Sequence, residues 1–152
     1  MKGKWAEGIE PRNFVWVIKD SLAICERPGG YGEHHRRVRR QEEIIWVRQH
    51  QFDVLYSLIA GSHNLHNYEE LGMPFRHRPW PLHDQLAQYM EVFFTEIHGA
   101  IAAGLKVLVH KEEVGERLCG LMAAYLLWAG LVPTGPQVTA IAERIFQQRL
   151  GP

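Results

Sequence analysis

Chemically active side chains crowd into one short stretch of this chain, residues 110–117. The stretch reads His-Lys-Glu-Glu-Val-Gly-Glu-Arg, so two cations, an imidazole and three carboxylates lie within these few consecutive residues. Apolar β-forming residues 107–109 precede it, and an apolar run, Leu118 to Leu127, follows. This order predicts a buried strand, a tight loop and a buried helix. Lys111 and Arg117 are therefore candidate contacts for an anion, either a ligand or a carboxylate of the loop itself.

The spacing of His110 and Arg117 resembles the phosphate-binding loop of the Cys-dependent protein phosphatases, both tyrosine and dual-specificity. Their signature is His-Cys, five further residues and then Arg, and here Lys111 stands at the position of the Cys. The resemblance extends over most of the chain and is strongest from Gly104 to Leu150. It implies that backbone N–H groups of the loop and the helix N-terminus cradle phosphate oxygens, while Arg117 binds two of them.

Three residue replacements in this loop depart from the pattern of that family. The family's Cys thiolate attacks phosphorus, which the ammonium group of Lys111 cannot do. Val114 stands where the family has a Gly in a tight turn (here Gly115 comes one residue later), and a β-branched residue strongly resists positive φ. Leu118 replaces a Ser or Thr whose hydroxyl helps the thiolate to leave.

The loop is also unusually acidic, with carboxylates at Glu112, Glu113 and Glu116. A carboxylate about 6 Å from a bound phosphate costs roughly 3 kcal/mol at an effective dielectric constant near 20. An outward orientation, or the charge of Lys111, would reduce that cost. Together with the three replacements, these carboxylates predict a pseudophosphatase, in which the fold is kept and the chemistry is lost.

Three further residues are weighed as site residues. The family uses an Asp on a nearby loop as general acid, and Asp84 is the only Asp in the right region, although it lies closer to residues 110–117 in sequence than is usual. The alternative is that Asp84 is a first-turn helix residue favoured by the helix dipole. Cys119 falls one turn into an apolar helix and is expected to be a small core residue rather than a substitute nucleophile. Trp80, between two prolines, is a candidate contact residue.

Two other clusters give weaker signals. A basic cluster could receive an acidic partner, a phosphopeptide or nucleic acid, or could be a solvated helix face paired with Glu33, Glu42 and Glu43; it comprises His34, His35, Arg36, Arg37, Arg39 and Arg40. No aromatic residues are interleaved with it, so we do not expect nucleic acid. His63-x-x-His66 and His83-Asp84 suggest metal ligands, but nothing completes either set by spacing, so we expect no metal and no other cofactor.

Composition points to an ordinary folded chain. Of its 152 residues 46% are hydrophobic, and 17 basic side chains balance 17 acidic ones. We expect one domain over residues 1–152, with 1–12 loosely packed, and no nucleic-acid or membrane partner. The N-terminus lacks a signal-peptide core, and the apolar run from Leu118 to Val132 is interrupted by Gly120 and Gly130 and short for a membrane span. A cytoplasmic location is the expectation.

Periodicity and turn residues predict alternating strands and helices. We expect a hairpin over 14–25, strands over 52–59, 73–78 and 105–109, and helices over 33–51, 64–71, 81–103, 116–130 and 136–150. The order indicates an α/β fold, a central mixed and partly parallel sheet with helices on both faces, which is similar to the small dual-specificity phosphatases.

The function expected from these features is binding of a phosphorylated or acidic ligand, or of a protein partner, in or beside the degenerate loop. A rival is a phosphate-ester hydrolase with a non-Cys mechanism that uses water, His110 or Asp84. A third alternative is a structural module closed by salt bridges within the loop. We expect Arg117 to pair with one or more carboxylates of its own loop or its neighbours, because an unpaired, partly buried guanidinium costs several kcal/mol.

Overall fold

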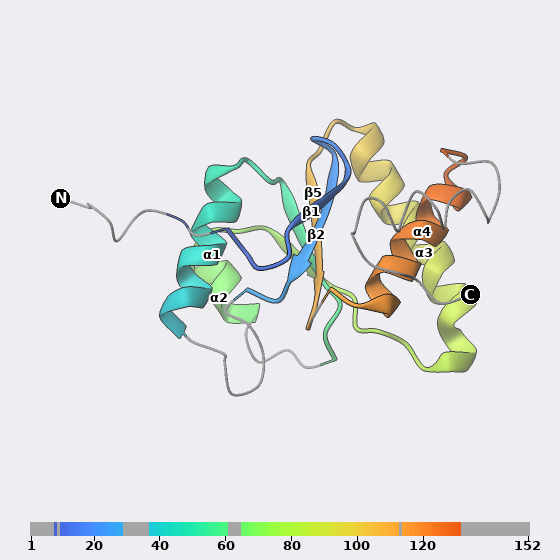
Figure 1. The fold of residues 1–152 in the computed structure, drawn as a ribbon, viewed down its shortest axis with the longest axis horizontal. Coiled ribbons are helices and arrows are strands. Elements are labelled where there is room, and N and C mark those ends of the chain that lie inside the picture. The colour runs from blue at the N-terminus through green and yellow to red at the C-terminus, as the bar shows by residue number, and fades with distance from the viewer. Residues whose placement is uncertain (1–7, 9, 29–36, 61–64, 113, 132–152) are drawn as a thin grey trace.

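A five-stranded sheet with the order β1-β2-β5-β3-β4 runs through the middle of the molecule (Figure 1). The computed structural model describes residues 8, 10–28, 37–60, 65–112 and 114–131. Strands β1 (Val15–Ile18) and β2 (Leu22–Glu26) form an antiparallel hairpin whose turn holds Asp20 at φ 66°. The other neighbours in the sheet are parallel, so most strands end at the same edge.

Strand β5 (Val107–Lys111) is the centre of this sheet. It pairs on one side with β2 and on the other with β3 (Val54–Ser57), and β4 (Phe75–His77) completes the edge beyond β3. Its first four residues are buried, as expected for an apolar strand covered on both faces. The register aligns His110 with Cys25 and Ser57, so the strand delivers Lys111 to the carboxyl edge of the parallel strands.

Helices cover both faces of the sheet, as Figure 1 shows. One face carries α1 (Arg37–Gln49) and α2 (Leu65–Glu70), and the other carries α3 (Leu86–Ala102) and α4 (Glu116–Trp128). Each face has its own apolar cluster, one around Ile44, Leu55 and Tyr68 and one around Phe93, Ile97 and Leu118. This is the α/β architecture expected from the sequence.

The helices and strands predicted between residues 14 and 130 are confirmed, with shifted ends. The helix expected from residue 81 begins later, because Leu82 is extended (φ −66°, ψ 155°) and a short 3₁₀ helix, η3 (His83–Gln85), precedes α3. The strand expected over 105–109 runs instead from Val107 to Lys111, since it follows the register of β2. The helix predicted over 136–150 lies outside the described residues.

The solvated alternative for the basic cluster is wrong at two positions. Arg40 is 7% exposed and Glu43 is 1% exposed, so both side chains point inward from α1. The charge of Arg40 acts on Tyr68, whose pKa is raised mainly by burial.

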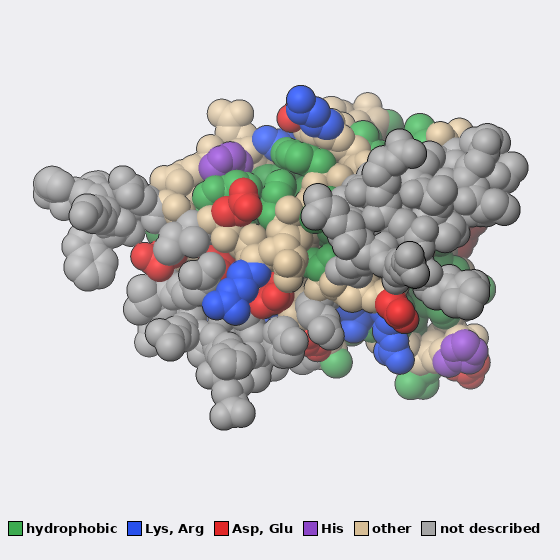
Figure 2. Space-filling model, viewed as in Figure 1, with side chains coloured by type: hydrophobic (Ala, Val, Ile, Leu, Met, Phe, Trp, Pro, Cys, Tyr) green, Lys and Arg blue, Asp and Glu red, His purple; other side chains and the backbone are tan. Residues whose placement is uncertain are grey.

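Elsewhere, on the face shown in Figure 2, acidic and basic side chains of the described residues are interspersed without a patch of one sign. No helix in the described part of the chain is both long and apolar enough to cross a membrane.

Helix α3 offers a test of the packing on the α4 face. Ile97 is fully buried and Val92 is 54% exposed on the same helix. We expect Ile97→Ala to lower the free energy of unfolding by about 2–5 kcal/mol, because it removes buried methylenes and leaves a cavity. Val92→Ala should change it by no more than about 0.5 kcal/mol. Urea denaturation followed by circular dichroism measures both, and equal effects would contradict the described packing.

Candidate functional site

The loop of residues 112–115 joins β5 to α4 at the carboxyl edge of the parallel strands. Gly115 is the N-cap of α4 with extended backbone (φ −119°, ψ −165°), and it has no side chain with which to cap the helix. The first N–H groups of α4 lie there, at the positive end of the helix dipole. A surface hollow of about 520 Å³, which we call the loop hollow, is lined by Lys111, Glu112, Gly115, Glu116, Arg117 and Leu118.

Lys111 is held by its neighbours rather than free in the loop hollow. Its side chain is only 18% exposed, and Nζ lies 3.4 Å from Oε1 of Glu112 and 5.1 Å from the ring centroid of Trp80. Glu112 faces a second cation as well: burial lowers the pKa of Arg27, and the Glu112 carboxylate is one of the charges that oppose this shift. The charge of Lys111 is therefore already partly balanced before any ligand arrives.

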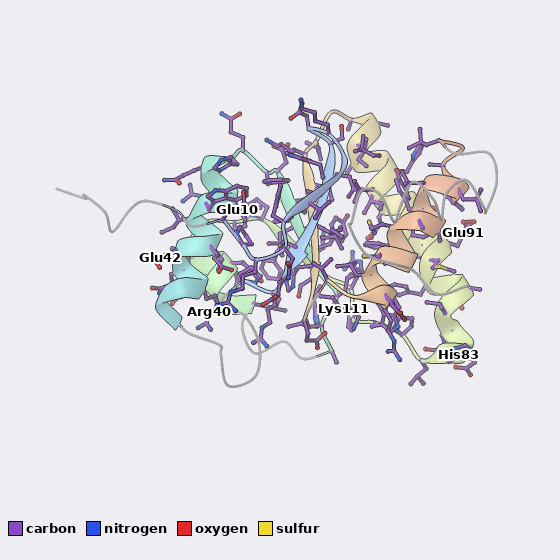
Figure 3. The ribbon with its side chains drawn as sticks, viewed as in Figure 1. Glu10, Arg40, Glu42, His83, Glu91 and Lys111 are labelled. Carbon is purple, nitrogen blue, oxygen red and sulfur yellow. The ribbon has the colours of Figure 1, made fainter. Side chains whose placement is uncertain are left out.

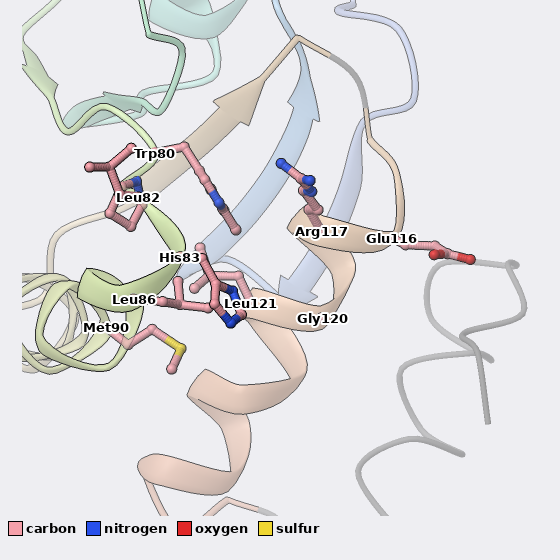
Figure 4. A pocket seen from close by; sticks show the side chains of 10 residues that line it. Trp80, Leu82, His83, Leu86, Met90, Glu116, Arg117, Gly120 and Leu121 are labelled. Carbon is pink, nitrogen blue, oxygen red and sulfur yellow. The ribbon is translucent and has the colours of Figure 1, made fainter.

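Arg117 differs from the expectation. Its side chain is exposed at the start of α4, and no residue in the described ranges forms a hydrogen bond or ion pair with its guanidinium. The expected pairing with a loop carboxylate is wrong for Glu112, which turns to Lys111, and for Glu116, which is exposed and points away from Trp80 in Figure 4. Glu113 lies outside the described residues. Because Arg117 is solvated, it does not carry the cost of a buried unpaired charge.

Two of the unusual loop residues serve the core. Val114 is 7% exposed and Leu118 is fully buried, and both belong to the apolar cluster between the sheet and helices α3 and α4. The β-branched side chain of Val114 thus anchors the loop to the core.

His110 is part of the framework and does not face the loop hollow. It is fully buried, and its Nε2 lies 3.1 Å from the hydroxyl oxygen of Tyr68 on α2. Burial lowers the pKa of His110 to about 3, so the ring is neutral at physiological pH. A ring that is enclosed, neutral and engaged with Tyr68 is placed to tie β5 to α2 rather than to transfer protons to a ligand.

The other candidate catalytic side chains also lie away from the loop hollow. Asp84 is exposed in η3 and lines neither the loop hollow nor the groove described below, which agrees with a first-turn helix position. Burial raises the pKa of the Cys119 thiol to about 11, and the pKa of the enclosed Cys25 thiol is also raised, chiefly by burial. Both thiols are therefore protonated at neutral pH, and neither is a ready nucleophile.

No group of three metal-ligating side chains lies close together among the residues that the structure describes. The candidate ligand His63 and the side chain of His66 are outside those residues.

Figure 3 shows Lys111 at the end of the central strands, with Arg40 on the α1 side of the sheet and His83 near the start of α3.

A groove beside the loop hollow was not predicted from the sequence. It has a volume of about 510 Å³ and lies between the segment before α3 and helix α4 (Figure 4); we call it the α3–α4 groove. It is lined by Trp80, Pro81, Leu82, His83, Leu86, Met90, Glu116, Arg117, Gly120 and Leu121. Its only sequence signal was Trp80 between two prolines. Glu116 and Arg117 line both hollows, so the two adjoin at the start of α4.

The wall that carries Trp80 is fixed by polar contacts. Arg78 donates from Nε and Nη2 to the two carboxylate oxygens of Glu96 on α3, at 3.0 and 2.8 Å. Tyr89 donates its hydroxyl to the carbonyl oxygen of Arg78 at 2.7 Å, and the N–H of Trp80 reaches the carbonyl oxygen of Leu58 at 3.1 Å. The groove wall is therefore built from ordered residues of the sheet edge and α3.

Solved structures share this fold at low sequence identity. A kinase associated phosphatase with its catalytic cysteine replaced by serine has a TM-score of 0.75 and 16% identity, over 93% of this chain and 88% of that one. Tk-PTP in the active form has a TM-score of 0.68 and 16% identity, over 92% and 88%. The catalytic core of the PP-IP phosphatase SIW14 from S. cerevisiae has a TM-score of 0.64 and 12% identity, over 95% and 82%.

No protein-family model matches the chain, and no curated protein is similar to it by sequence. At these identities the structural likeness establishes the fold alone. The chain has the fold of the dual-specificity and tyrosine phosphatases, and in this sense it is phosphatase-like.

The lowered pKa of His110 predicts a pH dependence of stability. The pKa of a histidine ring in the unfolded chain is about 6.5. Above that pH the ring is neutral in both the folded and the unfolded state, so His110 adds no pH dependence to the stability. Below it the unfolded chain binds a proton that the folded chain does not, so stability falls from about pH 6.5 towards pH 3 by at most about 1.4 kcal/mol per unit. In ¹⁵N NMR the His110 ring should stay neutral at pH 5, and His110→Asn should reduce the slope. A His110 signal that titrates near pH 6.5 would contradict this.

Proposed function

We propose that this phosphatase-fold chain has no Cys-type phosphatase chemistry and binds a phosphorylated or acidic ligand at the loop hollow. The observation that carries the proposal is the position of Arg117. It is an exposed cation without a partner among the described residues, and it stands at the N-terminus of α4, where the N-cap is a glycine. A guanidinium and helix N–H groups that converge on one hollow favour an anion.

The absence of catalysis rests on the nucleophile. Lys111 occupies the position of the family's Cys and is engaged with Glu112 and Trp80. The two thiols, Cys25 and Cys119, are buried with raised pKa values. The rival, a hydrolase that uses His110 or Asp84, is less well supported, because His110 is enclosed and neutral and Asp84 does not line the loop hollow.

Local charge sets what kind of anion fits best. Lys111 is balanced by Glu112, which leaves Arg117 as the main cation available at the loop hollow among its described lining residues. Glu112 and Glu116 line the same hollow, so a ligand with many negative charges meets repulsion there. One phosphate or carboxylate group on an otherwise less charged ligand suits this balance better than a polyanion.

Removal of the Arg117 charge tests the proposal. We expect Arg117→Ala to weaken binding of phenyl phosphate by about tenfold, because a charge-assisted hydrogen bond contributes roughly 1.5–3 kcal/mol and exposure reduces that value. The matched control is Arg48→Ala, which removes an exposed arginine from α1 on the other face of the sheet. NMR titration followed at the amides of residues 115–118 measures both. Equal losses, or no shift of these amides in the unaltered protein, would contradict the proposed site.

Restoration of the family's Cys tests the loss of chemistry. We expect no hydrolysis of p-nitrophenyl phosphate that thiol alkylation abolishes, and we expect Lys111→Cys to stay below about 1 per second, an ordinary enzyme rate. The substitution leaves Val114 and Leu118 in the core and removes the partner of Glu112, so a thiolate would meet an uncompensated carboxylate. Lys111→Ala is the control. Rapid alkylation-sensitive turnover by the Cys variant would show that the nucleophile alone was missing.

A further inference from the structure

The α3–α4 groove is chemically unlike the loop hollow that it adjoins. Apart from the shared residues Glu116 and Arg117, its lining is mostly apolar and includes Trp80, Leu86, Met90 and Leu121. Leu82, at its edge, is 70% exposed, the largest exposed fraction among the described large apolar residues. An apolar groove of this size with few polar groups is a common form of ligand site.

Gly120 gives a second, independent observation. It is an exposed residue inside α4 and lines the groove, and a Cβ placed on it would meet no heavy atom of the described residues within 4 Å. Glycine inside a helix costs roughly 0.5–1 kcal/mol relative to alanine. Packing of the described fold does not require that cost, since the space around Gly120 is open. A side chain there would instead project into the open space of the groove.

The two hollows meet at Arg117, which fixes the charge pattern of a ligand that fills both. Arg117 lines both hollows, and Figure 4 shows it at the start of α4, on the wall opposite Leu82. Glu116 points away from Trp80 and Leu86, so its carboxylate does not cross the junction. A complementary ligand carries one anionic group next to a large apolar one, with little other negative charge.

We propose, resting on the function proposed above, that the α3–α4 groove binds an apolar side chain of a protein partner's peptide segment. The neighbouring phosphorylated or acidic residue of that segment lies on Arg117 and the N-terminus of α4. A peptide supplies both groups at adjacent positions, whereas inorganic phosphate leaves the groove empty. The loop hollow therefore binds the anion, and the groove selects among the segments that carry one.

Two acetylated heptapeptides with a central phosphotyrosine test this assignment. One has leucine and the other glycine at the positions on either side of the phosphotyrosine, so they carry equal charge. We expect the leucine peptide to bind the unaltered protein about tenfold more tightly, since burial of a leucine side chain contributes on the order of this factor or more. Isothermal titration calorimetry measures both affinities. A leucine peptide with glutamate in place of phosphotyrosine shows whether a carboxylate suffices.

Matched glycine substitutions locate the effect. Gly120→Leu fills the groove, while Gly99→Leu adds the same side chain at another exposed helix position with open space around it, on α3. Leucine favours helices over glycine, so both variants should melt at or above the temperature of the unaltered protein. Gly120→Leu should abolish the tenfold preference for the leucine peptide, and Gly99→Leu should retain it.

The outcomes separate the groove from the loop hollow. Equal affinity for the two peptides, with binding still lost in Arg117→Ala, overturns the groove assignment and leaves the proposed function standing. The same result in Gly120→Leu and Gly99→Leu also overturns it. No binding of either peptide overturns both proposals. A concentration-dependent dimer that Gly120→Leu disrupts in sedimentation velocity would show that a second copy of the chain occupies the groove, and the proposed partner would be wrong.

Discussion

The site depends on the parallel pairing of β5 with both β2 and β3. That pairing buries the strand on both faces and sets its register, so Lys111 pairs with Glu26 at the carboxyl end of β5, where the loop to α4 begins. The packing of Val114 and Leu118 then fixes the loop and the first turn of α4 against the same sheet. The loop hollow and the α3–α4 groove both follow from this arrangement, because each uses the start of α4 as a wall.

The elements were readable from sequence because their patterns were strong and local. Alternating β-formers, the apolar stripe of α3 and the nearly all-apolar α4 each specify one element, and the His110 to Arg117 spacing specified the join. The orientation of individual charged side chains could not be predicted from the sequence. Whether Glu112 turns to Lys111 or to Arg117 depends on where Trp80 and Arg27 lie, and those residues come from distant segments. For the same reason, the sequence did not predict that the side chains of Arg40 and Glu43 point inward.

The loop sits on a phosphatase-like fold and is held by contacts of its own residues. Val114 and Leu118 make apolar contacts, and Lys111 forms an ion pair with Glu112. Each of these contacts holds the loop in place. The resemblance to the phosphatases implies a turn glycine, a hydroxyl and a thiolate at the positions of Val114, Leu118 and Lys111. Arg117, at the start of α4, remains exposed to solvent. The groove with Gly120 adds an apolar neighbour to that electrostatic feature.

The contact of Lys111 with the ring of Trp80 has a consequence for how long a ligand stays bound. A catalyst has to open and shed its product in every cycle, and lid motion often limits its rate. The ammonium group, 5.1 Å from the indole centroid, instead links the segment before α3 to the end of β5. A recess whose walls are already joined loses less conformational freedom when a ligand fills it. Such a recess is suited to long residence of a ligand, in line with the binding role proposed for this chain.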